Sequence, residues 1–75
     1  MLTAPQSRMA RAALRWTLDD LAQRAKVNRR TVARFEGEAG TPNESTVFLI
    51  RQAFEAAGVE FLPDGIRLKP GQDAA

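Results

Sequence analysis

Apolar residues recur at helical spacing in four stretches of this 75-residue chain. In the first stretch, Thr3 and Gln6 form a capping-box pattern with Pro5 inside the first turn, which predicts a helix that continues to about Arg15. Three apolar residues of this helix are expected to face the core: Ala10, Ala13 and Leu14.

The next two stretches are short and lie close together. Thr17 is a suitable cap for a helix whose first turn holds Asp19 and Asp20, where the helix dipole favours negative charge. Lys26 and Val27 predict a tight turn after this helix. Its apolar residues at helical spacing are Leu18, Leu21, Ala22 and Ala25.

The third predicted helix begins after its cap, Asn28, and ends near Gly37. At 100° per residue, Val32 and Phe35 fall on one side of it, which predicts that this side docks against the core. The opposite arc carries Arg30, Ala33 and Arg34, with Arg29 at its margin.

A loop with two glycines and a proline is predicted over residues 36–45. It leads into a fourth helix over residues 44–57, which Asn43 or Ser45 caps at the start and Gly58 ends. The inner face of this helix is expected to hold Val47, Ile50 and Phe54.

The pattern changes after residue 58, where two short runs of β-branched and large apolar residues flank a turn at residues 63–65. These runs predict a β-hairpin over residues 59–69, followed by a loose tail over residues 70–75. The predicted fold is therefore mainly α, with a bundle of about four helices in residues 1–58 and a short C-terminal β-hairpin.

The composition argues against several kinds of function. The chain has no cysteine and no histidine, so disulfides, the usual zinc ligands and the commonest general base are absent. A single domain this small also has little room for an enclosed pocket. We therefore expect no enzymatic activity, no cofactor, no metal and no small-molecule ligand.

Neither a membrane helix nor a secretion signal is expected. No apolar run approaches the roughly 18 residues that span a bilayer, and the N-terminal segment MLTAPQSR lacks the apolar centre of a signal peptide. We expect a soluble cytoplasmic protein without a membrane partner.

Charge is unevenly distributed along the chain. Residues 1–34 hold eight basic and two acidic side chains, a net charge of +6, whereas residues 35–75 hold three basic and seven acidic side chains, a net charge of −4. Such asymmetry is typical of a protein with a basic face for a polyanion. A scatter of solvated surface charges is the alternative.

The third predicted helix concentrates this positive charge. Arg30 and Arg34 are spaced i,i+4, so two like charges are neighbours, at a cost of about 0.2–0.5 kcal/mol in an isolated helix. Double-stranded DNA would offset the repulsion, because arginine binds guanine O6 and N7, or a phosphate, through its planar fork. Ala33 between them permits close approach to the groove floor or contact with a thymine methyl.

The segment RAALRWTLDDLAQRAKVNRRTVARFEG, residues 11–37, resembles the Xre/Cro (lambda repressor-like) helix-turn-helix family of bacterial and phage transcription regulators. The resemblance extends over roughly residues 3–58, and the ending AAGVEF is similar to a subgroup of very small regulators that finish in strands. The matching positions are Arg11, Leu14, Trp16, Thr17, Leu21, Ala22, Val27, Asn28, Val32, Phe35, Glu36, Thr46 and Val47.

This resemblance implies that the helix over residues 28–36 lies in the major groove of DNA. The family's base contacts fall on Arg29, Arg30 and Arg34, with Ala33 between them at the groove floor. Asn28, at the cap, is placed to contact either a base edge or a phosphate. Its phosphate contacts fall on Thr17, Leu18, Thr31, Asn43 and Ser45. Ordinary helix capping explains the small polar residues equally well, and both roles can coexist.

The family also places an arginine of its first helix against a glutamate late in its third helix. The resemblance therefore implies a structural ion pair between Arg11 and Glu36 that fixes the recognition helix, rather than a DNA contact. Trp16, the only tryptophan, is expected to fill the core rather than to stack on bases.

Three residues depart from the family pattern. Lys26 and Arg15 stand where glycines are usual, and Leu18 replaces a common glutamine at the start of the second helix. Either Lys26 accepts a positive φ at a cost of about 1 kcal/mol, or the turn differs slightly. These departures affect the detailed DNA footprint.

A domain of this size contacts few base pairs, so specificity is expected to come from a homodimer on two half-sites about 34 Å apart. We expect dimerisation through the open edge of the C-terminal hairpin, with apolar residues of the fourth helix nearby. Packing on the chain's own helices is the alternative for these residues. The candidate interface residues are Phe48, Leu49, Val59, Phe61, Ile66 and Leu68.

The sequence thus predicts a sequence-specific DNA-binding regulator associated with the nucleoid. A repressor is favoured, because a chain without a sensor domain can act by occupying a promoter. The alternative is a protein-interaction module, such as an antitoxin that binds a toxin. An enzyme is disfavoured by the absence of histidine, cysteine and paired carboxylates.

Overall fold

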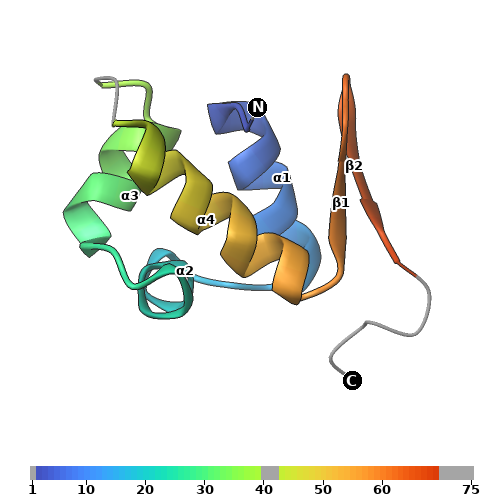
Figure 1. Cartoon of the computed structure of the whole chain (residues 1–75), viewed down its shortest axis with the longest axis horizontal. Coiled ribbons are helices and arrows are strands. Elements are labelled where there is room, and N and C mark those ends of the chain that lie inside the picture. The colour runs from blue at the N-terminus through green and yellow to red at the C-terminus, as the bar shows by residue number, and fades with distance from the viewer. Residues whose placement is uncertain (1, 40–42, 70–75) are drawn as a thin grey trace.

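The computed structural model describes residues 2–39 and 43–69 of the chain. Within these ranges four helices precede two strands, and the predicted mainly α fold with a C-terminal hairpin is confirmed (Figure 1). The centre of the predicted loop, residues 40–42, and the predicted loose tail, residues 70–75, lie outside the described residues. The elements are α1 (Ala4–Leu14), α2 (Leu18–Ala25), α3 (Arg29–Glu36), α4 (Glu44–Ala56), β1 (Val59–Leu62) and β2 (Gly65–Leu68).

Each helix begins at a side chain that accepts a hydrogen bond from a free backbone N–H of the first turn. Thr3 and Thr17 form reciprocal capping boxes with Gln6 and Asp20. Asn43, and not Ser45, caps α4 through a 2.8 Å bond from the Thr46 N–H, and Asn28 caps α3. These local bonds explain why the helix starts were predictable from the sequence.

The helix ends show how the two departures from the glycine pattern are accommodated. Arg15 after α1 and Lys26 after α2 both adopt the left-handed conformation, each with φ of 59°. Both turns therefore keep the geometry expected for glycine. Each of the two residues is strained by roughly 1–2 kcal/mol, because its Cβ lies too close to the backbone in this conformation.

The core lies where all four helices and the hairpin meet. Leu21, Val32, Ile50 and Phe54 are completely buried, as is Ala10. The inward orientation predicted for Ala13 is wrong, because its side chain is exposed. The further buried apolar residues are Leu2, Ala4, Ala22, Ala25, Phe35 and Val59.

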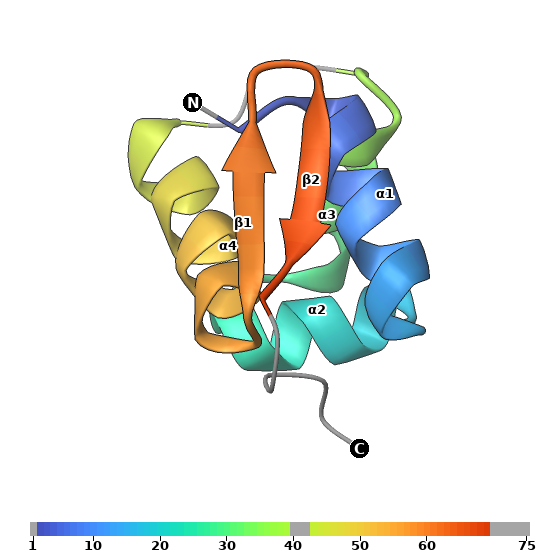
Figure 2. The ribbon, with the colours of Figure 1, turned by 90° about the vertical axis from the view of Figure 1, so that its right-hand side faces the viewer.

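The C-terminal hairpin covers the side of the bundle formed by α1 and α4, with β1 beside α4 and β2 beside α1 (Figure 2). Its two strands are antiparallel, with Phe61 opposite Ile66. Gln6 of α1 holds the hairpin turn, since its Nε2 donates to the carbonyl oxygen of Leu62 at 2.6 Å. The hairpin therefore completes the core of the same chain.

This packing contradicts the prediction that Val59 lies in a dimer interface. Val59, the first residue of β1, is completely buried because its side chain packs into the core beside α4. Phe61 and Ile66 are half-buried and pack against the same core, which matches the alternative of packing on the chain's own helices.

None of the helices in the described part of the chain has the length and apolar character that a membrane span requires.

Candidate nucleic-acid interface

The pair α2 and α3 forms a helix-turn-helix with a very short connection. Lys26 ends α2 in the left-handed conformation, and Asn28 caps α3 by accepting a hydrogen bond from the Arg30 N–H at 2.7 Å. Leu21 and Val32 are fully buried between the helices and the core. The connection is thus fixed at both ends, and α3 lies at the edge of the molecule away from the hairpin (Figure 1).

The outward arc of α3 carries the predicted arginines. Arg30 and Arg34 are exposed, and neither forms an ion pair with any residue in the described ranges. Ala33 between them is half-buried. Two arginines one turn apart, separated by a methyl group, therefore form a cationic ridge on this surface.

Arg29 differs from its two neighbours because it has a carboxylate partner. Its Nε lies 2.9 Å from Oδ1 of Asp19, in the first turn of α2. Both side chains are largely exposed, 60% for Arg29 and 69% for Asp19. The sequence pattern predicts Asp19 only as a favourable charge at a helix start and gives no sign of this pair.

Glu36 fixes the C-terminal end of α3 against α1. Nε and Nη2 of Arg11 donate to its carboxylate at 2.8–3.0 Å, which confirms the predicted ion pair. The hydroxyl of Ser7 donates to the same carboxylate at 2.6 Å, and Arg8 donates to the Glu36 carbonyl oxygen. Glu36 is only 4% exposed, so its charge is buried but fully paired.

Arg11 also ties this network to the end of α1. Its Nη1 donates to the carbonyl oxygen of Trp16 at 3.1 Å. The Trp16 ring stacks on Phe54 at 5.5 Å, and the guanidinium of Arg24 lies 4.6 Å from the indole centre. Trp16 therefore packs against the core as predicted, with one face covered by a cation.

The predicted phosphate-contacting residues are divided between two environments. Thr17, Asn43 and Ser45 are exposed at helix starts, whereas Thr31 is half-buried on α3. Leu18 is half-buried and packs against the core, although the backbone around it belongs to the first turn of α2.

Capping leaves hydrogen-bond donors free on several of these side chains. The Asn28 and Asn43 caps use the amide oxygen, so each amide nitrogen keeps two donors for an anion. The Thr17 hydroxyl accepts from the Asp20 N–H and can still donate its own proton. Capping and anion binding are therefore chemically compatible at these positions.

Apolar exposure is concentrated at a few residues outside this surface. Phe48 on α4 is 58% exposed, and its neighbour Leu49 is 37% exposed. Leu68 at the end of β2 and Met9 on α1 are similarly accessible. Of the six candidate interface residues, Phe48, Leu49 and Leu68 are thus the ones that a second chain can reach without opening the core.

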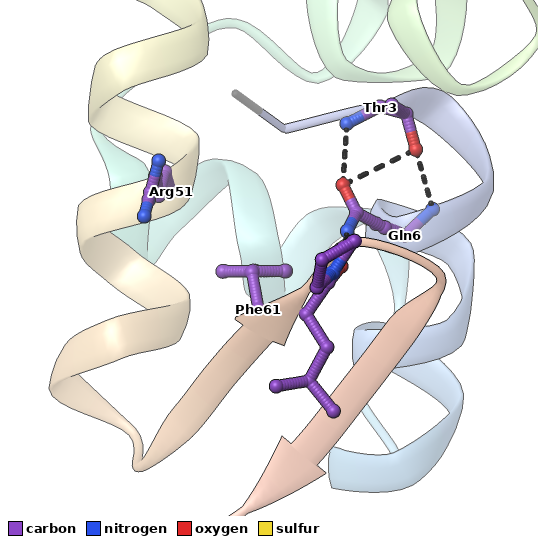
Figure 3. Close-up of a pocket in the computed structure, with 6 residues that line it drawn as sticks. Thr3, Gln6, Arg51 and Phe61 are labelled. Carbon is purple, nitrogen blue, oxygen red and sulfur yellow. Dashed lines mark hydrogen bonds between the residues drawn. The ribbon is translucent and has the colours of Figure 1, made fainter.

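A pocket of about 420 Å³ lies between the start of α1, α4 and the hairpin turn (Figure 3). Its polar groups already have partners: Gln6 binds the Thr3 N–H and the hairpin, and Arg51 pairs with Glu55 and lies over Phe61. The bond from Gln6 to Leu62 and the contact of Arg51 with Phe61 hold the hairpin to the helices. In residues 2–39 and 43–69 there is also no group of three or more acidic side chains placed to hold a metal ion.

No protein-family model matches the chain, and the comparison with curated proteins gives no match. The likeness to Xre/Cro regulators therefore stays a prediction from the residues of the helix-turn-helix.

Proposed function

We propose that the chain is a DNA-binding regulator of the Xre/Cro type that inserts α3 into the major groove. The observation that carries this proposal is the pair of exposed arginines on α3, Arg30 and Arg34, without ion-pair partners among the described residues. Arginine forks of this kind suit guanine edges and phosphates.

The support beneath the helix adds to this proposal. Glu36 joins α3 to Arg11 and Ser7 of α1, so the cationic ridge stands on a rigid base rather than on a loop. A recognition helix needs such a base, because a displaced helix cannot align several side chains with base edges at once. If Arg30 and Arg34 were only solvated surface charges, α3 would not need the buried ion pair of Glu36 to fix its position.

Helix starts near the ridge supply further anion-binding groups. The free amide nitrogens of Asn28 and Asn43 are suitable for phosphates on either side of the groove. Acting as a homodimer, such a protein would occupy two half-sites and exclude other proteins from a promoter, which favours a repressor.

The proposal is tested with the double variant Arg30→Ala/Arg34→Ala, and binding is measured by fluorescence anisotropy on duplexes that wild type selects from a random library. We expect affinity to fall at least about thirtyfold, since each of the two arginine contacts contributes about 1–3 kcal/mol. The matched control is Arg67→Ala/Lys69→Ala, which removes the same charge from exposed positions on the hairpin. Equal affinities for the two double variants, both folded by circular dichroism, would refute the proposal.

The exposure of Phe48 supports a second candidate, a protein-interaction module such as an antitoxin. The variant Arg30→Ala/Arg34→Ala distinguishes the DNA-binding regulator from the interaction module. A module that acts only through α4 would keep its activity in the cell, whatever that activity is, in this variant. Loss of activity in the arginine variant, with α4 unchanged, favours DNA binding.

A further inference from the structure

The ion pair between Asp19 and Arg29 joins the two helices of the helix-turn-helix at their N-terminal ends. Asp19 lies in the first turn of α2, and Arg29 is the first residue of α3. The pair leaves Arg29 in a different state from Arg30 and Arg34, which have no carboxylate partner in the described part of the chain.

We propose that Asp19 is a positioning residue that directs Arg29 to a base edge and disfavours its use as a phosphate contact. This inference rests on the proposed function, and it assigns to Asp19 a role in specificity. Asp19 itself need not touch DNA.

The geometry of the contact favours base binding over phosphate binding. The carboxylate approaches Nε at 2.9 Å, which leaves Nη1 and Nη2 as donors for another group. Two parallel donors at the end of the side chain are the group that binds guanine O6 and N7. A guanidinium held at Nε keeps this fork while losing part of its rotational freedom.

The charge of Asp19 acts in the same direction. A carboxylate within 3 Å of the guanidinium neutralises Arg29 locally and repels a phosphate that approaches it. Base edges carry no net charge, so they suffer much less from this repulsion. The pair therefore weakens sequence-independent binding more than sequence-specific binding. This raises the ratio of specific to non-specific affinity.

The test compares wild type with Asp19→Asn, Arg29→Ala and the double variant. Each is titrated against the duplex that wild type selects from a random library and against a scrambled duplex of the same composition. The control Asp64→Asn removes the same charge from the exposed hairpin turn, at the opposite end of the molecule from α3 (Figure 1). A further variant, Asp19→Glu, keeps the charge.

We expect Asp19→Asn to bind the scrambled duplex more tightly and to lower the ratio of specific to scrambled affinity by about fivefold or more, the discrimination of one arginine–guanine pair. Asp19→Glu should recover part of this ratio, and Asp64→Asn should leave it unchanged. Arg29→Ala should lower the ratio in wild type and change it little in the Asp19→Asn background.

An unchanged ratio in Asp19→Asn, or equal effects of Arg29→Ala in both backgrounds, would overturn the role of Asp19. A wild type that binds DNA but selects no preferred site also overturns it, while DNA binding stands. If wild type binds no duplex at all, the proposed function fails and this inference falls with it.

Discussion

Glu36 is the residue on which the placement of α3 depends most. Its carboxylate is nearly inaccessible to water, and the three hydrogen-bonding groups around it are Nε and Nη2 of Arg11 and the hydroxyl of Ser7. A buried carboxylate costs several kcal/mol unless such partners compensate it. The same partners belong to α1, so the energy that stabilises the charge also sets the position of α3.

We expect Glu36→Gln to lower the free energy of unfolding by about 3 kcal/mol, because the Arg11 guanidinium would lose its counter-charge in a mostly buried site. A domain of this length has a total stability of about 4–11 kcal/mol, so the loss is large but measurable by urea unfolding. Glu55→Gln is the control, since its pair with Arg51 is exposed and worth at most about 1 kcal/mol. Equal losses in the two variants would contradict this account of Glu36.

At the scale of elements, the helix ends are the strained parts of the fold. Arg15 and Lys26 occupy left-handed positions that a glycine adopts without steric cost. The short connection between α2 and α3 requires this conformation at Lys26, because the next helix begins only three residues later. The strained conformation of Lys26 therefore lets α2 and α3 pack closely.

Replacing Lys26 with glycine should stabilise the protein by about 0.5–1 kcal/mol. Removing the left-handed strain raises the free energy of unfolding by roughly 1–2 kcal/mol. The greater backbone freedom of glycine in the unfolded chain lowers it by about 0.5–1 kcal/mol. The expected rise in Tm is about 4 °C, measured by thermal unfolding. Lys26→Ala removes the same charge and keeps the strain, so a Tm of Lys26→Gly no higher than that of Lys26→Ala would show that this position is not strained.

The elements also show what a sequence can and cannot predict. Helix starts such as Thr17 and Asn28 carry their own capping groups, so local pattern located them correctly. Ala13 was misplaced because the helical period allows a wide inner arc, and only the neighbouring elements decide its limits. Val59 was misplaced for a related reason, since strand alternation shows which residues share a face but not what covers it.

Pairs between distant residues were predictable only where the family resemblance supplied them. The Arg11–Glu36 pair was expected for that reason, whereas the bonds of Glu36 to Ser7 and of Asp19 to Arg29 have no signal in local pattern. The exposed arc of α3, by contrast, follows directly from helical geometry, so the candidate surface is predictable from the sequence while the residues that support it are not.

At the scale of the whole molecule, the position of the hairpin bears on how two chains would share one operator. The molecule measures 34 Å along its longest axis, with α3 near one end and the hairpin near the other (Figure 1). Under the proposed function, the α3 helices of two chains on adjacent half-sites must lie only about 34 Å apart. A dimer joined end to end at the hairpins would place them much farther apart, so the exposed face of α4 is the better interface.

We therefore expect Phe48→Glu to yield a monomer, because a charge at the most exposed large apolar side chain of α4 cannot be buried against a second copy. Sedimentation at tens of micromolar should show a dimer for wild type and for the control Met9→Glu, which places the same charge on α1. Phe48→Glu should also lose cooperative binding to a duplex with two half-sites while keeping its affinity for one. Deleting residues 59–75 is not an equivalent test, because Val59 belongs to the core and its loss would unfold the chain. Identical sedimentation of wild type and Phe48→Glu would exclude α4 as the interface.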